Sequence, residues 1–329
     1  MSIESGSGSI VRPEHITDLK IAVIGAGLMG HSIAGTLASA GGQVTVVDSH
    51  VPTLNAAPGR ISEQLINLHR DPSVVEQITL SGDLETAIQG ADLVMEAVPE
   101  RLELKQQLFT TISRLLPDAV LATNTSVFRI GEVFADVVNP ERALGTHWWN
   151  PPHLVPVVEV VQSDHTGPDV ALWVIEILRQ AGKIPIHVRK DVPGFIGNRL
   201  QHALWREAIS LVDAGVCDAQ TIDLLVRNSF GLRLAAMGPI ENADYVGLDL
   251  TLAVHEYLFP SLERSVDPSQ TLRDLVAEGN LGAKTGSGFL QWKAGDREAA
   301  ADRLEQHLIS QLTTAPRSAA AEHPNPPHS

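Results

Sequence analysis

Cysteine is almost absent from this chain of 329 residues. Its one cysteine, Cys217, cannot form a disulfide within the chain, which excludes a disulfide-stabilised scaffold and fits a reducing compartment such as the cytoplasm. The 13 histidines show no metal-ligand spacing with the cysteine or with one another. The sequence therefore predicts no metal centre.

Positive charge and long apolar runs are also scarce. Lysine and arginine number 24 against 39 acidic residues, and the net charge of −15 argues against binding to nucleic acid or to an anionic membrane surface. No apolar segment is long enough to span a bilayer, and the polar start over residues 1–13 does not resemble a signal peptide. We therefore expect a soluble, cytoplasmic protein, and the length predicts two domains.

What the chain does have is a glycine-rich turn between a predicted strand and a predicted helix. Residues 19–24 form a short apolar run, and residues 25–30, GAGLMG, fit the pattern G-x-G-x-x-G. Helical apolar spacing follows over 31–40, and a second strand over 43–47 ends at Asp48. This β-α-β context predicts a dinucleotide site, because the helix N-terminus and the glycine backbone can receive a pyrophosphate. The candidate cofactor-binding residues of the turn are Gly25, Gly27, Leu28, Met29 and Gly30.

Asp48 indicates which dinucleotide would bind. A carboxylate at this strand end accepts hydrogen bonds from the adenosine ribose and repels a 2′-phosphate. Ser49 and His50 follow, so no lysine or arginine stands there to hold that phosphate. NAD is favoured over NADP.

The rest of the first half alternates predicted strands with predicted helices. This alternation is typical of an α/β fold with a Rossmann-type, doubly wound parallel sheet. After Gly194 the strand signals vanish, and an all-α domain is expected. The predicted strands are 78–80, 91–98 and 120–123, and the predicted helices are 52–69, 84–89, 102–116, 195–214, 218–226 and 248–259. The expected organisation is a disordered segment 1–14, an NAD-binding domain 15–193, a helical substrate and dimerisation domain 194–312 and a disordered tail 313–329.

A histidine and a glutamate stand on two neighbouring apolar runs. His147 closes one run, and Glu159 lies inside the next, over 155–161. If both runs are adjacent strands, the carboxylate can bind the imidazole, fix its tautomer and make it a better base. The alternative is a core histidine and an exposed glutamate.

Seven motifs give the chain a resemblance to the 3-hydroxyacyl-CoA dehydrogenase family. They occur in the family's order between residues 19 and 292. They are GAGLMG at 25–30, EAVPE at 96–100, NTS at 124–126, THWWNP at 146–151, DVPGFIGNR at 191–199, MGP at 237–239 and LGAKTGSGF at 281–289.

The resemblance implies a role for each matched residue. His147 would be the general base, oriented by Glu159, and Ser126 and Asn198 would hydrogen-bond the reacting oxygen or the adjacent carbonyl. A helix cap and a buried amide are the structural alternatives for the latter two. The residues expected at the nicotinamide half of NAD are Glu100, Lys105, Asn150 and Lys284.

Two departures from the family concern the substrate. Val127 stands where the family commonly has a second serine. The acyl-CoA enzymes carry a lysine-rich arm that meets CoA, whereas residues 49–91 here contain no lysine and only Arg60 and Arg70. The CoA phosphates would have few cationic partners.

The segments at residues 94–105, 150–156 and 231–239 resemble the L-gulonate 3-dehydrogenase and lambda-crystallin branch of the family, whose members act on free hydroxy acids. Arg233 falls where that branch has an arginine, and a guanidinium can bind a free carboxylate with two hydrogen bonds. The alternative is that Arg233 pairs with Glu241 or Asp244. Trp148 and Trp149 would either line the substrate pocket or pack between domains.

The sequence therefore favours an NAD-dependent dehydrogenase of a free, L-gulonate-like 3-hydroxy acid. A true 3-hydroxyacyl-CoA dehydrogenase is the alternative, and a non-catalytic, crystallin-like protein is a third possibility. The resemblance also implies a homodimer through the helical half, where apolar residues exceed what one small domain can bury. The candidates for that shared surface are Leu200, Leu204, Ile209, Leu211, Val212, Ile222, Leu224, Leu225 and Val226.

Overall fold

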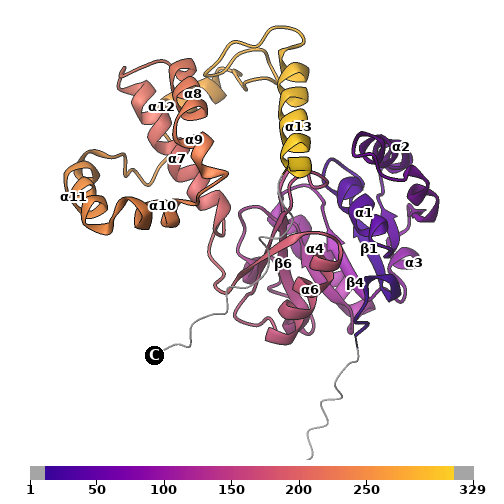
Figure 1. Ribbon diagram of the computed structural model, residues 1–329. Coiled ribbons are helices and arrows are strands. Elements are labelled where there is room, and N and C mark those ends of the chain that lie inside the picture. The colour runs from indigo at the N-terminus through magenta and orange to yellow at the C-terminus, as the bar shows by residue number, and fades with distance from the viewer. Residues whose placement is uncertain (1–11, 315–329) are drawn as a thin grey trace, which may run out of the picture. The chain divides into compact units, whose positions relative to one another are not determined.

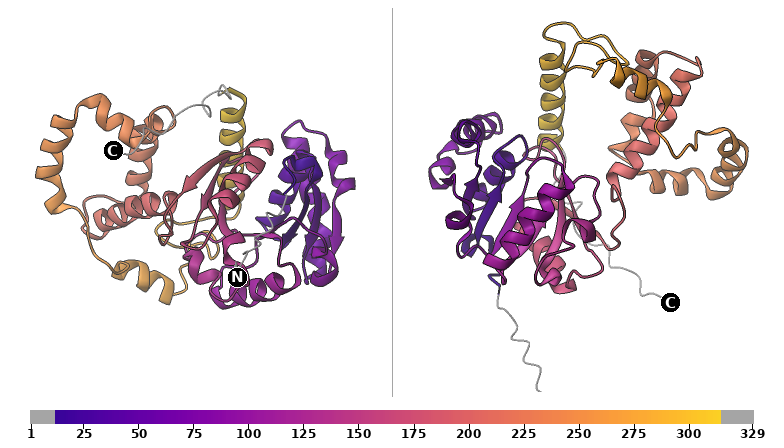
Figure 2. Two further views of the ribbon diagram at one scale, coloured as in Figure 1. Left: turned by 90° about the horizontal axis from the view of Figure 1, so that it is seen from below. Right: turned by 180° about the vertical axis from the view of Figure 1, so that it is seen from behind.

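The computed structural model describes residues 12–314 of the chain (Figure 1). They divide into two compact units. The first contains the residues up to Asn198 together with those from Glu305 onward, and the second contains Arg199–Leu304. Strands flanked by helices build the first unit, and helices dominate the second (Figure 2).

An eight-stranded sheet forms the middle of the first unit, in the order β3-β2-β1-β4-β5-β6-β7-β8. All neighbouring strands are parallel except β6 and β7. The expected Rossmann-type, doubly wound sheet is therefore confirmed, and it departs from the predicted parallel arrangement at one pair, because β6 and β7 are antiparallel. The connection between β6 and β7 is too short for the crossover that a parallel pair needs. The strands are β1 (Lys20–Ile24), β2 (Gln43–Val47), β3 (Thr79–Ser81), β4 (Leu93–Glu96), β5 (Val120–Thr123), β6 (Ala143–Trp148), β7 (Val157–Val161) and β8 (Ile184–Val188).

Helices cover both faces of this sheet because its strands alternate between two apolar cores. Ile21 and Val23 of β1 belong to one core, and Ala22 and Ile24 belong to the other. The helices of the first core are α1 (Gly30–Ser39), α2 (Val51–Asn67) and α6 (Pro168–Gln180). Those of the second core are α3 (Leu84–Ile88), α4 (Leu102–Leu115) and α5 (Ile130–Val133).

The second unit contains no named strand among its residues. The predicted helices 195–214, 218–226 and 248–259 correspond to α7, α8 and α11, whereas α9, α10, α12 and α13 were not predicted. The helices from Gly197 onward are α7 (Gly197–Asp213), α8 (Ala219–Asn228), α9 (Phe230–Leu234), α10 (Pro239–Val246), α11 (Leu248–Leu258), α12 (Gln270–Ala277) and α13 (Asp296–Thr314). Short 3-10 helices lie at Ile16–Asp18, Pro72–Gln77, Pro140–Arg142 and Phe259–Ser261.

The predicted disorder of residues 1–14 is wrong for its last three residues. Arg12 pairs with Asp169 at 2.8 Å, the Trp173 indole N–H donates to the Pro13 carbonyl at 2.8 Å, and Gln180 donates to the Glu14 carbonyl at 3.0 Å. At the other end, α13 runs to Thr314, past the predicted start of the tail. Residues 1–11 and 315–329 lie outside the described part of the chain.

No helix in the described range 12–314 has both the length and the apolar character to cross a membrane. The same residues contain no group of three or more potential metal ligands.

Candidate functional site

The glycine-rich turn between β1 and α1 has the geometry that its motif predicts. Gly25 has a φ of 98°, and a Cβ there would lie 2.7 Å from the Ala97 carbonyl oxygen. A Cβ on Gly30 would lie 1.6 Å from the Gly25 carbonyl oxygen, so helix and turn need a glycine to pack. Nothing lies within 4 Å of the Cβ position of Gly27. The backbone beside the α1 N-terminus is therefore open to a pyrophosphate, and the turn fits a dinucleotide.

Asp48 lies at the carboxyl end of β2 and is held in place by the backbone. One carboxylate oxygen accepts the Ala26 N–H at 2.8 Å, and the other accepts the His50 N–H at 2.8 Å. The side chain is therefore fixed beside the glycine-rich turn, where the adenosine ribose of a dinucleotide would lie.

His147 and Glu159 are register partners on the antiparallel strands β6 and β7. The Nδ1 atom of His147 lies 2.7 Å from a Glu159 carboxylate oxygen, and the two residues are 4% and 2% exposed. The expected pair is therefore present, and the alternative of an exposed glutamate is excluded. Since a carboxylate only accepts hydrogen bonds, Nδ1 carries the proton and Nε2 is left as the acceptor.

Backbone amides hold the other oxygen of Glu159. The N–H groups of Ile196 and Gly197 donate to it at 2.9 and 3.0 Å. Burial alone would raise the pKa of the Glu159 carboxyl, but the hydrogen bonds from His147, Gly197 and Ile196 outweigh burial, and the pKa is lowered. Glu159 is therefore ionised at neutral pH and can stabilise a proton taken up by His147.

Aromatic rings pack against the imidazole. Trp149 and Phe195 lie 5.1 and 5.8 Å from His147, measured between ring centroids. A Cβ on Gly197 would lie 2.2 Å from the Trp149 ring, so glycine makes room for that indole. Trp148, in contrast, is 1% exposed and belongs to the first core, so it does not line a substrate pocket.

Ser126 follows β5 and is held from two directions. Its N–H donates to Glu100 at 2.8 Å, and its carbonyl accepts the Asn198 side-chain amide at 2.8 Å. Thr125 also donates its hydroxyl to Glu100, at 2.6 Å. Asn198 is therefore used at least partly as a structural amide. The Ser126 hydroxyl forms no hydrogen bond within the described residues, so it is available to a ligand.

Lys105 is enclosed by two carboxylates. Its ammonium lies 2.6 Å from Glu96 and 3.2 Å from Glu100, and its side chain is 1% exposed. Glu96 also accepts the Thr123 hydroxyl at 2.6 Å and the Val98 N–H at 2.7 Å. Burial raises the pKa of the Glu96 carboxyl, and Lys105 opposes that shift. Direct contact between Lys105 and a cofactor stays a prediction.

Glu96 and Thr125 were missed as site residues by sequence reasoning. Both lie inside motifs of the family resemblance, next to residues that were chosen, and that proximity is the signal that could have found them. Their side chains find their hydrogen-bond partners only when β4 and β5 lie side by side in the folded sheet.

The remaining predicted residues lie further along the chain. Asn150 is exposed just after β6. Lys284 and Arg233 are exposed residues of the second unit. Arg233 forms no ion pair in the described part of the chain, so the alternative pairing with Glu241 or Asp244 is absent.

Two largely buried side chains, Lys183 and His153, hold the turn after Asn150 in place. Lys183 donates to the carbonyls of Pro152 and Val155 at 2.5 and 3.1 Å, and Nδ1 of His153 lies 2.9 Å from the Ser32 hydroxyl of α1. Burial, and next to it the nearby Arg70, lowers the pKa of Lys183 to about 8. Burial, with the nearby Lys183, lowers the pKa of His153 to about 4.

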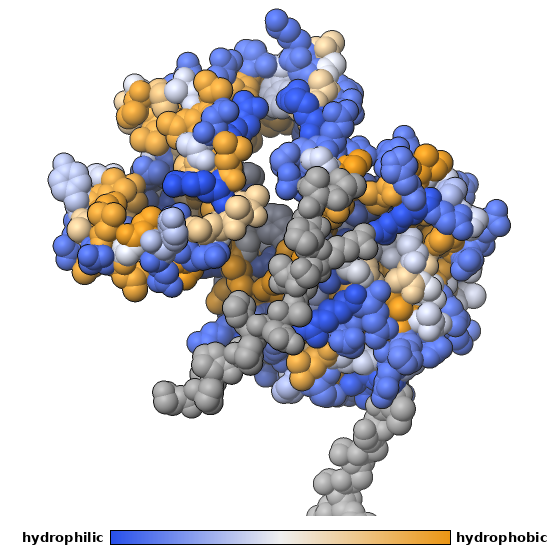
Figure 3. Space-filling model, in the orientation of Figure 1, coloured by the Kyte–Doolittle hydropathy of each residue, from blue (hydrophilic) through white to orange (hydrophobic). Residues whose placement is uncertain are grey.

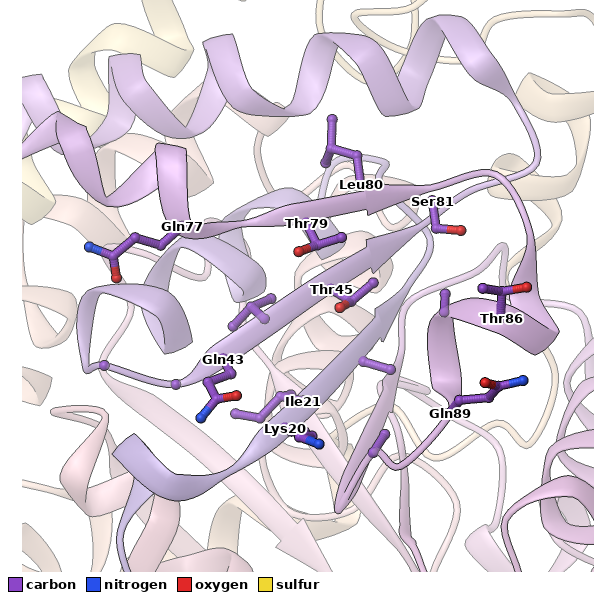
Figure 4. Close-up of a pocket in the computed structure, with 16 residues that line it drawn as sticks. Lys20, Ile21, Gln43, Thr45, Gln77, Thr79, Leu80, Ser81, Thr86 and Gln89 are labelled. Carbon is purple, nitrogen blue, oxygen red and sulfur yellow. The ribbon is translucent and has the colours of Figure 1, made fainter.

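The surface of the first unit has two hollows, and His147 lines neither of them. One of about 670 Å³ lies on the face of β1, β2 and β3 and includes Lys20 and Gln43 at the amino ends of their strands (Figure 4). Ligands of such sheets bind at the carboxyl ends, so this hollow is not the expected site. The other, of about 500 Å³, lies between α1 and α2 beside Leu28 and contains Arg60 together with Glu63 and Glu305. One permanent cation against two carboxylates does not favour a polyphosphate there.

Comparison with known proteins decides the family. The model of the 3-hydroxyacyl-CoA dehydrogenase NAD binding domain matches residues 20–192, and the model of the 3-hydroxyacyl-CoA dehydrogenase C-terminal domain matches residues 194–292. The chain belongs to the 3-hydroxyacyl-CoA dehydrogenase family. It is an NAD-dependent oxidoreductase of this type and acts on a CH–OH group.

Individual relatives span almost the whole chain. A 5-formyl-3-hydroxy-2-methylpyridine 4-carboxylate 5-dehydrogenase of Mesorhizobium japonicum is 34% identical over 88% of this chain and 96% of its own. A probable 3-hydroxybutyryl-CoA dehydrogenase of Bacillus subtilis is 35% identical over 83% of this chain and 97% of its own. The crystal structure of a 5-formyl-3-hydroxy-2-methylpyridine 4-carboxylic acid 5-dehydrogenase, described as an NAD+-dependent dismutase, has a TM-score of 0.84 and 32% identity, and the match covers 89% of this chain and 97% of that one.

Proposed function

We propose that this enzyme oxidises the hydroxyl group of a free hydroxy acid, with His147 as the general base. The observation that carries the proposal is the buried pair of His147 and Glu159, which leaves Nε2 as the acceptor. Nε2 takes the hydroxyl proton, and bound NAD supplies the hydride acceptor. A base within hydrogen-bond reach is needed because hydride leaves the carbon only as the proton leaves the oxygen.

Glu159 and Ser126 support this step in different ways. Glu159, fixed by two backbone amides, keeps the Nδ1 proton in place and stabilises the imidazolium that forms. The Ser126 hydroxyl, which forms no hydrogen bond within the described residues, would donate to the substrate oxygen as negative charge develops on that oxygen. Asn198 acts through Ser126, because its amide holds the Ser126 carbonyl.

A free carboxylate is the substrate feature that we favour over CoA. The hollow between α1 and α2 offers Arg60 as its one permanent cation, so the CoA phosphates lack partners there. Arg233, which resembles the arginine of the L-gulonate 3-dehydrogenase branch, has no acidic partner in the described chain. The Mesorhizobium japonicum relative is named for a substrate with a free carboxylate, which also supports this proposal.

The second candidate is a true 3-hydroxyacyl-CoA dehydrogenase. The Bacillus subtilis relative, at similar identity, carries a CoA substrate in its name. A non-catalytic, crystallin-like protein is disfavoured, because the paired His147 and Glu159 and the available Ser126 form a complete set for proton transfer. We further propose a homodimer through the second unit, and a reducing, cytoplasmic environment on the evidence of the single Cys217.

The test is a panel of 3-hydroxy acids, each offered as the free acid and as the CoA thioester, with NADH formation followed by absorbance. We expect turnover of at least one free acid with a higher kcat/KM than its thioester. Faster turnover of every thioester would establish the second candidate, and no NADH formation with any hydroxy compound would refute the proposed chemistry.

A further inference from the structure

The segment 195–197, which leads into α7, contacts both members of the pair formed by His147 and Glu159. The ring of Phe195 lies 5.8 Å from that of His147, measured between centroids. The backbone N–H groups of the next two residues donate to one oxygen of Glu159 at 2.9 and 3.0 Å. Because the other oxygen of Glu159 binds Nδ1 of His147, these three consecutive residues hold the pair at both the imidazole and the carboxylate.

The backbone at the start of this segment is strained. Phe195 has a φ of 51°, in the left-handed region that residues with a bulky side chain rarely adopt. The residue is 1% exposed and belongs to the second core, so its ring cannot turn away from the imidazole. Such a conformation persists only where the surrounding structure enforces it, and active sites are where it is concentrated. The fold therefore accepts backbone strain to keep this ring beside His147.

At Gly197, glycine is required for space and not for backbone freedom. Its φ lies outside the left-handed region, so an alanine could adopt the same backbone conformation. A Cβ there would, however, overlap the six-membered ring of the Trp149 indole. That indole packs against His147, with 5.1 Å between the ring centroids. A side chain at position 197 would therefore displace the indole and, through it, the imidazole.

These contacts give one glycine control over the position of the base. We propose that Gly197 is a positioning residue for the reaction, which admits Trp149 against His147 and holds Glu159 through its own amide. The inference rests on the proposed function, since it takes His147 as the group that accepts the substrate proton. The position matters because displacement of a catalytic group by about 1 Å can lower the rate about a hundredfold.

The experiment observes the imidazole directly in Gly197→Ala by proton NMR. A proton on Nδ1 that is donated to a buried carboxylate resonates far downfield, and its loss in His147→Gln identifies the resonance. In Gly197→Ala the resonance should shift or broaden. The kcat for L-gulonate, or for 3-hydroxybutyryl-CoA if only the thioester reacts, should fall about ten- to a hundredfold, while NAD affinity stays near that of the wild type. An unchanged resonance with unchanged kcat would overturn the proposal.

Trp149→Phe provides the rescue. Phenylalanine keeps an aromatic ring but is shorter than the indole, so it removes the atoms that the new Cβ would overlap. In the double variant Gly197→Ala with Trp149→Phe, the resonance should return, and kcat should lie within about threefold of that of Trp149→Phe alone. An equal loss of kcat in both backgrounds would contradict the proposal, because the effect would then not pass through the indole.

Gly59→Ala in α2 is the matched control and should change neither the resonance nor kcat, because nothing lies within 4 Å of a Cβ at that position. If Gly197→Ala does not fold, the double variant decides: it must fold and react as Trp149→Phe does, and an unfolded or inactive double variant would overturn the proposal. A failure of the proposed function has a different signature. His147→Gln would then keep wild-type turnover, whereas the resonance in Gly197→Ala would still report how the imidazole is held.

Discussion

The two units of the chain bury their apolar residues to very different degrees. In the first unit, Val23, Leu37 and Val158 have no exposed surface. In the second, not one residue of helices α8 to α12 is buried, and Leu224 and Tyr257 are 60% and 89% exposed. Apolar side chains are visible on the surface of this unit (Figure 3).

This difference indicates how the two units divide their tasks. The first unit completes its own core and can hold a base and a carboxylate in a fixed geometry. The helices of the second unit expose apolar surface that a single copy leaves uncovered, and such surfaces usually mark an interface. We therefore propose that the first unit carries the chemistry and that the second unit would make a contact between two copies.

The largest effect is expected in the first unit, on the rate of the chemical step. Replacing His147 with Gln should lower kcat by about a hundredfold or more, because the base is lost, while NAD affinity stays near that of the wild type. Steady-state kinetics and a separate NAD titration check this. Near-wild-type turnover would show that the proton leaves by another route and that the pair of His147 and Glu159 does not carry the proton transfer.

The second prediction concerns the uncovered helices. Leu224→Glu combined with Leu225→Glu should raise the dimer dissociation constant by about a hundredfold or more, since a fully buried leucine contributes about 1.5–3 kcal/mol. Light scattering over a concentration series measures this. Leu172→Glu, at a 59% exposed position on α6 of the first unit, is the matched control and should not alter assembly. A wild type that is monomeric at micromolar concentration would refute the interface.

A smaller effect is expected at the cofactor end of the first unit. Asp48→Ser with Ser49→Arg should shift the preference from NAD toward NADP by about tenfold or more, because repulsion is removed and a phosphate partner is added. The ratio of kcat/KM for the two cofactors measures the shift. If the unaltered enzyme already prefers NADP, the interpretation of Asp48 is wrong.

The smallest effect concerns acid stability. The pKa of His153 is about 4 in the folded chain against 6.5 for the free side chain, so the unfolded chain binds the proton more readily. Its contribution to the free energy of unfolding is complete above pH 6.5 and is lost as the pH falls through about 4.

His153→Asn should therefore reduce the loss of unfolding free energy over that pH range by about 1–3 kcal/mol. Urea denaturation at several pH values measures it. His165→Asn, an exposed position in the same unit, is the control and should leave the curve unchanged. Identical curves for wild type and His153→Asn would show that burial of this imidazole has no effect on acid stability.

The sequence predicted the first unit better than the second. The β-α-β element around the glycine-rich turn and the strand at 120–123 follow from local patterns, and the structure confirms them. The pairing of His147 with Glu159 was predictable because each residue stands on a short apolar run. The antiparallel turn between β6 and β7 was not, since periodicity gives no strand direction.

Buried charge could not be predicted from the pattern. Lys105 lies in an amphipathic helix, where a lysine normally faces solvent, and its enclosure depends on Glu96 of a neighbouring strand and on Glu100. The short helices α9, α10 and α12 have too few turns for periodicity to identify them. The exposed apolar surface of the second unit, in contrast, was expected from the sequence, and four of the residues named for it, Leu200, Leu204, Leu224 and Leu225, are exposed.

The central claim, that a free carboxylate defines the substrate, is tested most directly at Arg233. The measurement is kcat/KM for a 3-hydroxy acid and for its CoA thioester, in the wild type and in Arg233→Met. The account predicts that the free acid is the better substrate of the wild type and that its KM rises steeply in the variant, since losing a charged partner costs about 2–5 kcal/mol of binding. Turnover of the thioester should hardly change. The account would be contradicted if Arg233→Met left the KM of every free acid unchanged and the wild type preferred the thioester.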